Sequence, residues 1–97
     1  MSGILIHVST LASGDIAVAL AGACRRAGVT WSCFFTNDGV KVLADEAMVV
    51  ALGAAGSAVA CEKSWEEHMG GVECPVELGS QTINSTLMGE ADKVIGI

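Results

Sequence analysis

Short apolar runs alternate with stretches of helical spacing along the whole chain. The runs GILIHV and VTWSCFFT are rich in branched and aromatic residues, which is typical of strands. Between them, apolar residues recur every three or four positions from Ile16 to Ala27, and Gly28 follows where a helix would end. The pattern predicts strands at residues 3–8, 29–36, 57–60 and 93–97.

The remaining segments predict helices and one loop. Helical spacing resumes at Val40, and Asp38 is placed to cap the start of that helix. A short helix is expected over residues 62–69 and a weakly amphipathic one over residues 80–90. Residues 73–79 contain the only proline and are expected to form a loop.

Strands that are apolar on both faces indicate a sheet that is covered on both sides. Because strands and helices alternate, right-handed crossovers would make this sheet parallel. We therefore predict one α/β domain over residues 1–97, in which a parallel β-sheet is flanked by helices on both faces in three Rossmann-like or flavodoxin-like layers. Reactive groups in such sheets collect at the carboxyl ends of the strands. Here those ends carry Ser9 and Thr10, Asn37 to Gly39, and Cys61.

Composition narrows the range of partners. The chain is 52% hydrophobic and only 16% charged, so the apolar surplus covers a buried sheet, forms subunit interfaces, or does both. Its net charge is −6 and its only basic cluster is Arg25 and Arg26, which makes nucleic acid a poor candidate partner. No apolar run approaches the ~20 residues of a spanning helix, and no basic leader begins the chain, so a cytoplasmic protein is expected.

The four cysteines contain no CxxC pair, which argues against a thioredoxin-type motif and a zinc ribbon. In a reducing compartment all four are expected to be free thiols. Cys24 shares a helix face with apolar residues, and Cys33 lies within a strand. We expect both to pack as small hydrophobic core residues.

Cys61 differs because it stands where the third predicted strand gives way to a helix. Unpaired N–H groups and the helix dipole at that position stabilise a thiolate, and Lys63 and Ser64 are close enough in sequence to support it. Carboxylates on the same short helix oppose ionisation: Glu62, Glu66 and Glu67. Placement alone therefore leaves two interpretations open, a reactive cysteine and a packed cap residue.

Two histidines and the last cysteine have simpler interpretations. His7 is expected to be a hydrogen-bonded core residue, and His68 lies ~10 Å along the helix from Cys61, too far for direct proton exchange. Cys74 is either a resolving thiol for Cys61 or a packed loop residue. The spacing C-x6-H-x5-C matches no common zinc site, and phosphate-loop and dinucleotide signatures are missing, so we expect neither a metal nor a cofactor.

Three stretches together resemble the DsrE/DsrF-like sulfur-relay family, in particular its peroxiredoxin-like branch. They are FFTNDGVKVL, VACEKSWEEHMG and GEADKVIGI, and the likeness spans nearly the whole chain. The resemblance implies a parallel sheet flanked by helices, assembled as a trimer or hexamer. It also implies that Cys61 accepts sulfane sulfur as a persulfide and passes it to a partner protein, as a sulfurtransferase or sulfur carrier.

Two other functions remain open at this stage. One is an oligomeric binding or assembly module of the same fold, without sulfur transfer. The other is a thiol redox protein that uses Cys61 and Cys74 as a reversible pair.

Overall fold

The computed structural model describes residues 3–97 and contains a five-stranded parallel sheet with the order β4-β3-β2-β1-β5. This confirms the predicted α/β class. The strands are β1 (Ile4–Val8), β2 (Trp31–Phe35), β3 (Ser57–Cys61), β4 (Glu77–Gly79) and β5 (Lys93–Gly96). The α-helices are α1 (Gly14–Ala27), α2 (Glu46–Leu52), α3 (Glu62–Met69) and α4 (Gln81–Glu90), and two 3₁₀ segments are η1 (Leu11–Ser13) and η2 (Asn37–Ala44).

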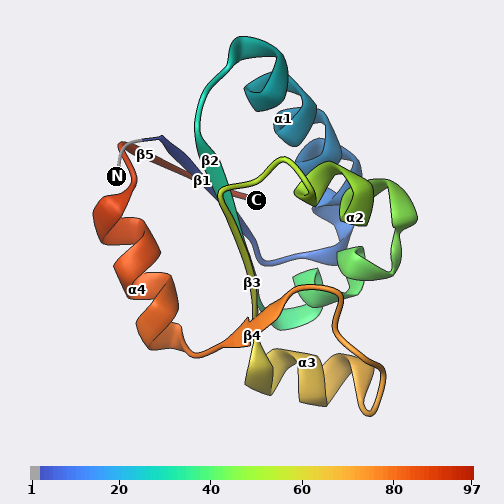
Figure 1. Ribbon diagram of the computed structural model, residues 1–97. Helices are drawn as coiled ribbons and strands as arrows, with labels where there is room; N and C mark the ends of the chain where they lie inside the picture. Colours follow the sequence, from blue (N-terminus) through green and yellow to red (C-terminus); the bar gives the residue numbers. More distant parts are fainter. Residues whose placement is uncertain (1–2) are drawn as a thin grey trace.

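The strand order decides which helix covers which face of the sheet. The chain steps outward in one direction from β1 to β4, so right-handed crossovers place α1, α2 and α3 on the same side. It then returns across the sheet to β5, which places α4 on the opposite side (Figure 1). The sheet is thus flanked on both faces, but among the described elements α4 is the one helix on its second face. Within residues 3–97 no helix has both the length and the apolar character needed to cross a membrane.

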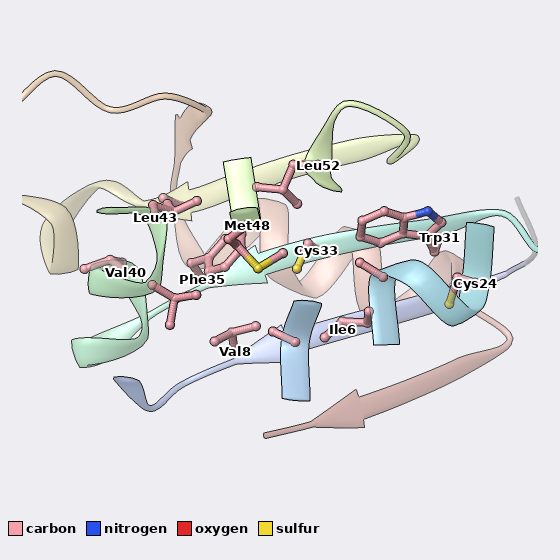
Figure 2. Close-up of a cluster of buried hydrophobic side chains, with 14 of the residues drawn as sticks. Ile6, Val8, Cys24, Trp31, Cys33, Phe35, Val40, Leu43, Met48 and Leu52 are labelled. Carbon is pink, nitrogen blue, oxygen red and sulfur yellow. The ribbon is translucent and has the colours of Figure 1, made fainter. Parts of the chain in front are cut away.

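The larger apolar cluster lies between the sheet and helices α1 and α2 (Figure 2). Trp65 of α3 also belongs to it. Cys33 is fully buried there and Cys24 nearly so, which confirms the core role predicted for both. Burial raises the pKa of Cys33 to about 12, because a thiolate would lose its hydration in this setting. Cys33 is therefore not placed for thiol chemistry.

The smaller cluster lies between the sheet and α4. Its buried members are Leu5, Phe34, Val59 and Cys61, and α4 packs Ile83, Leu87 and Ala91 against them. His7 stacks on Phe34 with 5.8 Å between the ring centroids and 16° between the ring planes. The prediction that His7 is a core residue is wrong, because His7 is only half-buried.

The segment predicted as a loop over residues 73–79 ends in a strand. β4 pairs in parallel with β3, so that Cys61 lies opposite Gly79. Pro75 suggested a loop because proline cannot donate to a sheet ladder, but it lies before the strand, and β4 is a short edge strand. This strand matters because it delivers the start of α4 to the carboxyl edge of the sheet.

The single helix predicted from Val40 onward is divided in two. Val40 and Leu43 are buried three residues apart, which fits the three-residue turn of the 3₁₀ segment η2. A new α-helix then starts at Glu46, where the Asp45 side chain accepts a hydrogen bond from the N–H of Ala47 at 3.0 Å. The cap predicted at Asp38 is therefore wrong, and Asp45 has that role instead.

Gly39 allows η2 to approach β1 closely. A Cβ atom at this position would lie 2.5 Å from the carbonyl oxygen of Val8, and backbone cannot move aside as a flexible side chain could. We expect Gly39→Ala to lower the free energy of unfolding by about 1–3 kcal/mol, as overpacking does. Urea titration measures the effect.

The control is Gly89→Ala, because nothing lies within 4 Å of a Cβ added at that position in α4. An alanine there is expected to stabilise the helix by about 0.5–1 kcal/mol. Equal stability of the two variants would contradict the close approach at Gly39.

Candidate functional site

A pocket of about 430 Å³ opens at the carboxyl edge of the sheet. The ends of β2 and β3 and the connection from β4 to α4 supply its walls, as expected for a parallel α/β sheet. Its lining residues are Thr36, Asn37, Cys61, Glu62, Lys63, Ser64, Glu67, Ser80 and Gln81. Ser9 and Thr10, which the sequence placed at the same edge, are outside this lining, and the N–H of Ser9 donates to Ile97 instead.

Cys61 ends β3 and occupies the N-cap position of α3. Its residue is 6% exposed, and it is both a member of the apolar cluster under α4 and part of the pocket wall. The backbone is extended at Cys61 and turns helical at Glu62, so the first free N–H groups of α3 follow the sulfur directly. The point where the sequence predicts a change from strand to helix is therefore also the boundary between the apolar core and the pocket.

Several donors surround the sulfur of Cys61. Burial, the largest single effect, opposes ionisation, but the Ser64 hydroxyl and N–H, the Gln81 amide and the Lys63 N–H outweigh it. The pKa of Cys61 is consequently lower than that of an ordinary cysteine. Because the Cys61 side chain makes no capping hydrogen bond, these groups act as an electrostatic environment that favours the charged thiolate.

The hydroxyl of Ser64 is oriented by its own partners. It accepts a hydrogen bond from the N–H of Asn37 at 2.9 Å, and its oxygen lies 3.4 Å from Oγ1 of Thr36. With the Asn37 donor on its oxygen, the hydroxyl can turn its proton toward Cys61. Asn37 has a φ of 53°, a left-handed conformation that asparagine tolerates better than most residues. The turn after β2 therefore positions a residue on α3.

Lys63 and the neighbouring carboxylates surround the mouth of the pocket. Glu62, Lys63 and Glu67 line it and are exposed, whereas Glu66 faces the adjoining groove. Water screens exposed charges, so the carboxylates oppose the thiolate less than the close donors favour it. The structure thus places Lys63 and Ser64 beside Cys61, through a backbone N–H for Lys63 and through both N–H and hydroxyl for Ser64.

Cys74 occupies a different place from Cys61. It lines a separate groove of about 740 Å³ between α3, the following loop and β4. Its side chain packs against the larger cluster, on the opposite side of the sheet from the cluster that contains Cys61. Burial raises the pKa of Cys74, partly offset by the N–H of Val76. The structure therefore does not bring the two thiols into one pocket.

His68 is exposed on α3. Across residues 3–97, no three side chains of His, Cys, Asp or Glu come together in a group that could hold a metal ion.

No family model matches the chain, and no curated protein or solved structure shows significant similarity to it. The interpretation of the site consequently depends on its geometry.

Sequence reasoning missed three members of the site. They are Thr36, which was treated only as the end of a strand, and Ser80 and Gln81, which were included only in a weakly amphipathic helix. The available signal was their position, because each lies within two residues of the end of a strand, and the carboxyl ends of these strands meet at the same edge of the sheet. Recognising β4 as a strand would have identified Gln81.

The role of Ser64 can be tested by Ser64→Ala. We expect the pKa of the Cys61 thiol to rise. The variant removes a hydroxyl that stabilises the thiolate, while burial continues to disfavour it. Alkylation of Cys61 by iodoacetamide should slow at pH 7 by about two- to tenfold, since only the thiolate reacts. The rate as a function of pH is followed by mass spectrometry of the Cys61 peptide.

Ser85→Ala provides the matched control, because Ser85 lies exposed on α4. Its alkylation profile should coincide with that of the unmodified protein. An unchanged profile in Ser64→Ala would remove Ser64 from the site.

Proposed function

We propose that this protein is a sulfur-relay protein, a carrier or sulfurtransferase, that accepts sulfane sulfur as a persulfide on Cys61 and passes it to a partner protein. The observation that supports this most directly is the arrangement at Cys61. A thiol at the end of a strand and the start of a helix lines a pocket, and the surrounding donors lower its pKa. The resemblance to the DsrE/DsrF-like family points to the same residue.

The chemistry requires only thiol exchange. The Cys61 thiolate attacks the outer sulfur of a donor persulfide, R–S–SH, so that a new S–S bond forms and the donor leaves as R–S⁻. An acceptor thiolate then attacks the outer sulfur of the Cys61 persulfide, takes it as R′–S–SH and releases the Cys61 thiolate. Electrons and atoms balance in both steps, and neither a metal nor an organic cofactor takes part.

The donors around Cys61 suit both steps. Cys61 is the attacking thiolate in the first step and the leaving thiolate in the second, and a lowered pKa makes the leaving group better. The nucleophile remains available at neutral pH because the thiolate fraction is larger than that of an ordinary cysteine. The pocket volume of about 430 Å³ gives room for the end of a partner's side chain.

The surface around the pocket indicates what a protein partner would present. Glu62 and Lys63 line both the Cys61 pocket and the adjoining groove of about 740 Å³, and the groove adds Glu66 and Glu73 to its rim. This excess of negative charge favours donor and acceptor proteins whose docking surfaces are basic.

Two further parts of the proposal concern setting and assembly. A cytoplasmic location suits free thiols, because disulfides are rare there. Large apolar side chains on α1 and α2 remain exposed, among them Ile16 at 54% and Val50 at 72%, and these support a homo-oligomer such as a trimer or hexamer.

The decisive test is sulfur loading followed by intact-mass measurement. The protein is incubated with thiosulfate or with a low-molecular-weight persulfide, freed of the donor, and weighed. A gain of about 32 Da, the mass of one sulfur atom, that a thiol acceptor removes again supports the relay. A loss of about 2 Da on oxidation that requires both Cys61 and Cys74 would instead favour the redox pair. Failure of both, together with slow alkylation of Cys61, would leave a binding or assembly module.

A further inference from the structure

We propose that Asn84 is a positioning residue for the Cys61 site and that it holds the amide of Gln81 with its NH₂ end toward Thr36 and the sulfur. The inference depends on the Cys61 site of the proposed function, but it concerns the ionisation of the thiol and not the identity of the sulfur donor. Asn84 does not line the pocket, so its effect on Cys61 passes through Gln81.

The hydrogen bonds fix the orientation of Gln81. Its Nε2 donates to Oγ1 of Thr36 at 3.5 Å, and its Oε1 accepts from Nδ2 of Asn84 at 3.4 Å. A glutamine amide has one donating end and one accepting end, and rotation by half a turn exchanges them. Both contacts are long, so neither alone would hold the amide. Together they favour the orientation in which the donating end faces the pocket.

The position of Asn84 on α4 brings its side chain next to that of Gln81. Asn84 follows Gln81 by three residues on α4, and residues at that spacing lie side by side on a helix. Gln81 is exposed at the pocket wall, whereas Asn84 is 8% exposed beneath the helix. A buried amide thus orients an exposed one.

Asn84 carries an unsatisfied polar atom at this buried position. Its Oδ1 has no hydrogen-bond partner among residues 3–97, while its Nδ2 contacts Gln81 and, at 3.9 Å, the sulfur of Met88. A buried carbonyl oxygen without a partner destabilises the folded state, and an apolar side chain of similar size would avoid that loss. The oxygen therefore contributes no bond to the fold, and the contacts that distinguish asparagine from leucine are those of its Nδ2, to Oε1 of Gln81 and, at longer range, to the sulfur of Met88.

Loss of the Asn84 donor would release the Gln81 amide. Rotation would then bring Oε1 toward the sulfur, where a carbonyl oxygen repels the thiolate instead of stabilising it. The expected consequence is a less acidic Cys61 in a protein that is folded at least as stably.

The experiment compares Asn84→Leu, Gln81→Ala and the double variant. We expect Asn84→Leu to have a melting temperature equal to or above that of the unmodified protein. We also expect its Cys61 to react with iodoacetamide about two- to fivefold more slowly at pH 7, with the midpoint of the pH profile shifted upward. In the Gln81→Ala background, the Asn84 substitution should leave the profile unchanged, since the group through which it acts is gone.

Two controls complete the design. Ser85→Leu adds the same side chain at the neighbouring exposed position and should leave the profile of Cys61 unchanged. Asn84→Ala removes the donor with a smaller side chain, so that it still reports on Cys61 if leucine prevents folding. It should slow alkylation as Asn84→Leu does.

The outcomes distinguish this proposal from the proposed function. An unchanged pH profile in both Asn84 variants, or an equal shift with and without Gln81, overturns the positioning role even if Cys61 takes up sulfur. A shift that requires Gln81 supports it even if sulfur loading fails.

Discussion

Cys61→Ser is expected to abolish sulfur loading. The gain of about 32 Da after incubation with thiosulfate or a persulfide should vanish, because a serine hydroxyl is not ionised near neutral pH and cannot form the S–S bond that holds the sulfur. This is the largest functional effect we expect of any single substitution. Cys61 also borders the polar lining of the pocket, where a serine hydroxyl can be accommodated, so intact mass can be compared on folded proteins.

The other cysteines provide the controls. Cys74→Ser should load as the unmodified protein does, since Cys74 lines a different groove and burial raises its pKa. Cys24→Ser and Cys33→Ser alter core residues, so they should load sulfur but unfold more easily. Loading that survives in Cys61→Ser, or disappears in Cys74→Ser, would assign the sulfur-accepting role to another thiol.

Phe34→Ala is expected to destabilise the protein more than any of the other substitutions. Phe34 is fully buried in β2 and belongs to the small cluster that attaches α4 to the sheet. Truncation to alanine removes its contacts with neighbouring strands and leaves a cavity, which costs about 3–5 kcal/mol at such positions. A domain of this size has about 5–15 kcal/mol to lose, so the variant should be close to the limit of folding.

The loss should be concentrated at α4. The larger cluster is anchored by several helices, whereas the smaller one depends on Ile83, Leu87 and Ala91 of α4. Urea titration measures the total loss, and amide exchange should show that α4 loses protection before α1 does. Val72→Ala, a truncation of a side chain that is 58% exposed and lies outside α1 and α2, serves as control and should cost no more than about 0.5 kcal/mol. A similarly small effect of Phe34→Ala would contradict the packing described for this face.

These two predictions are linked through Gln81. The first turn of α4 brings Gln81 to the pocket wall, so a helix that separates from the sheet would also withdraw one of the donors from Cys61. Phe34→Ala protein that remains folded should therefore show slower alkylation of Cys61. The ionisation of Cys61 therefore depends on the packing of α4 against the sheet.

The local sequence pattern predicted helices and strands correctly where the signal came from a continuous run of residues. The strand before Ser9 and the helix over residues 62–69 were predictable because apolar spacing and glycine positions act on the nearest neighbours in the chain. The pattern failed at β4, whose three residues become a strand only by pairing with β3. It also failed at η2, where contact with Val8 fixes the path of the chain.

The sequence by itself determined the parallel α/β class, the burial of Cys24 and Cys33, and the place of Cys61 at the end of a strand and the start of a helix. These follow from hydrophobic periodicity and from the fixed geometry of a helix terminus, which are local properties. Only the tertiary structure decided what surrounds the sulfur. The Asn37 N–H that orients Ser64 and the amide of Gln81 come from segments distant along the chain, which meet because parallel strands end at one edge. The pKa of Cys61 depends on the balance between burial and these donors. Because the donors come from distant segments, this balance cannot be predicted from the local sequence pattern.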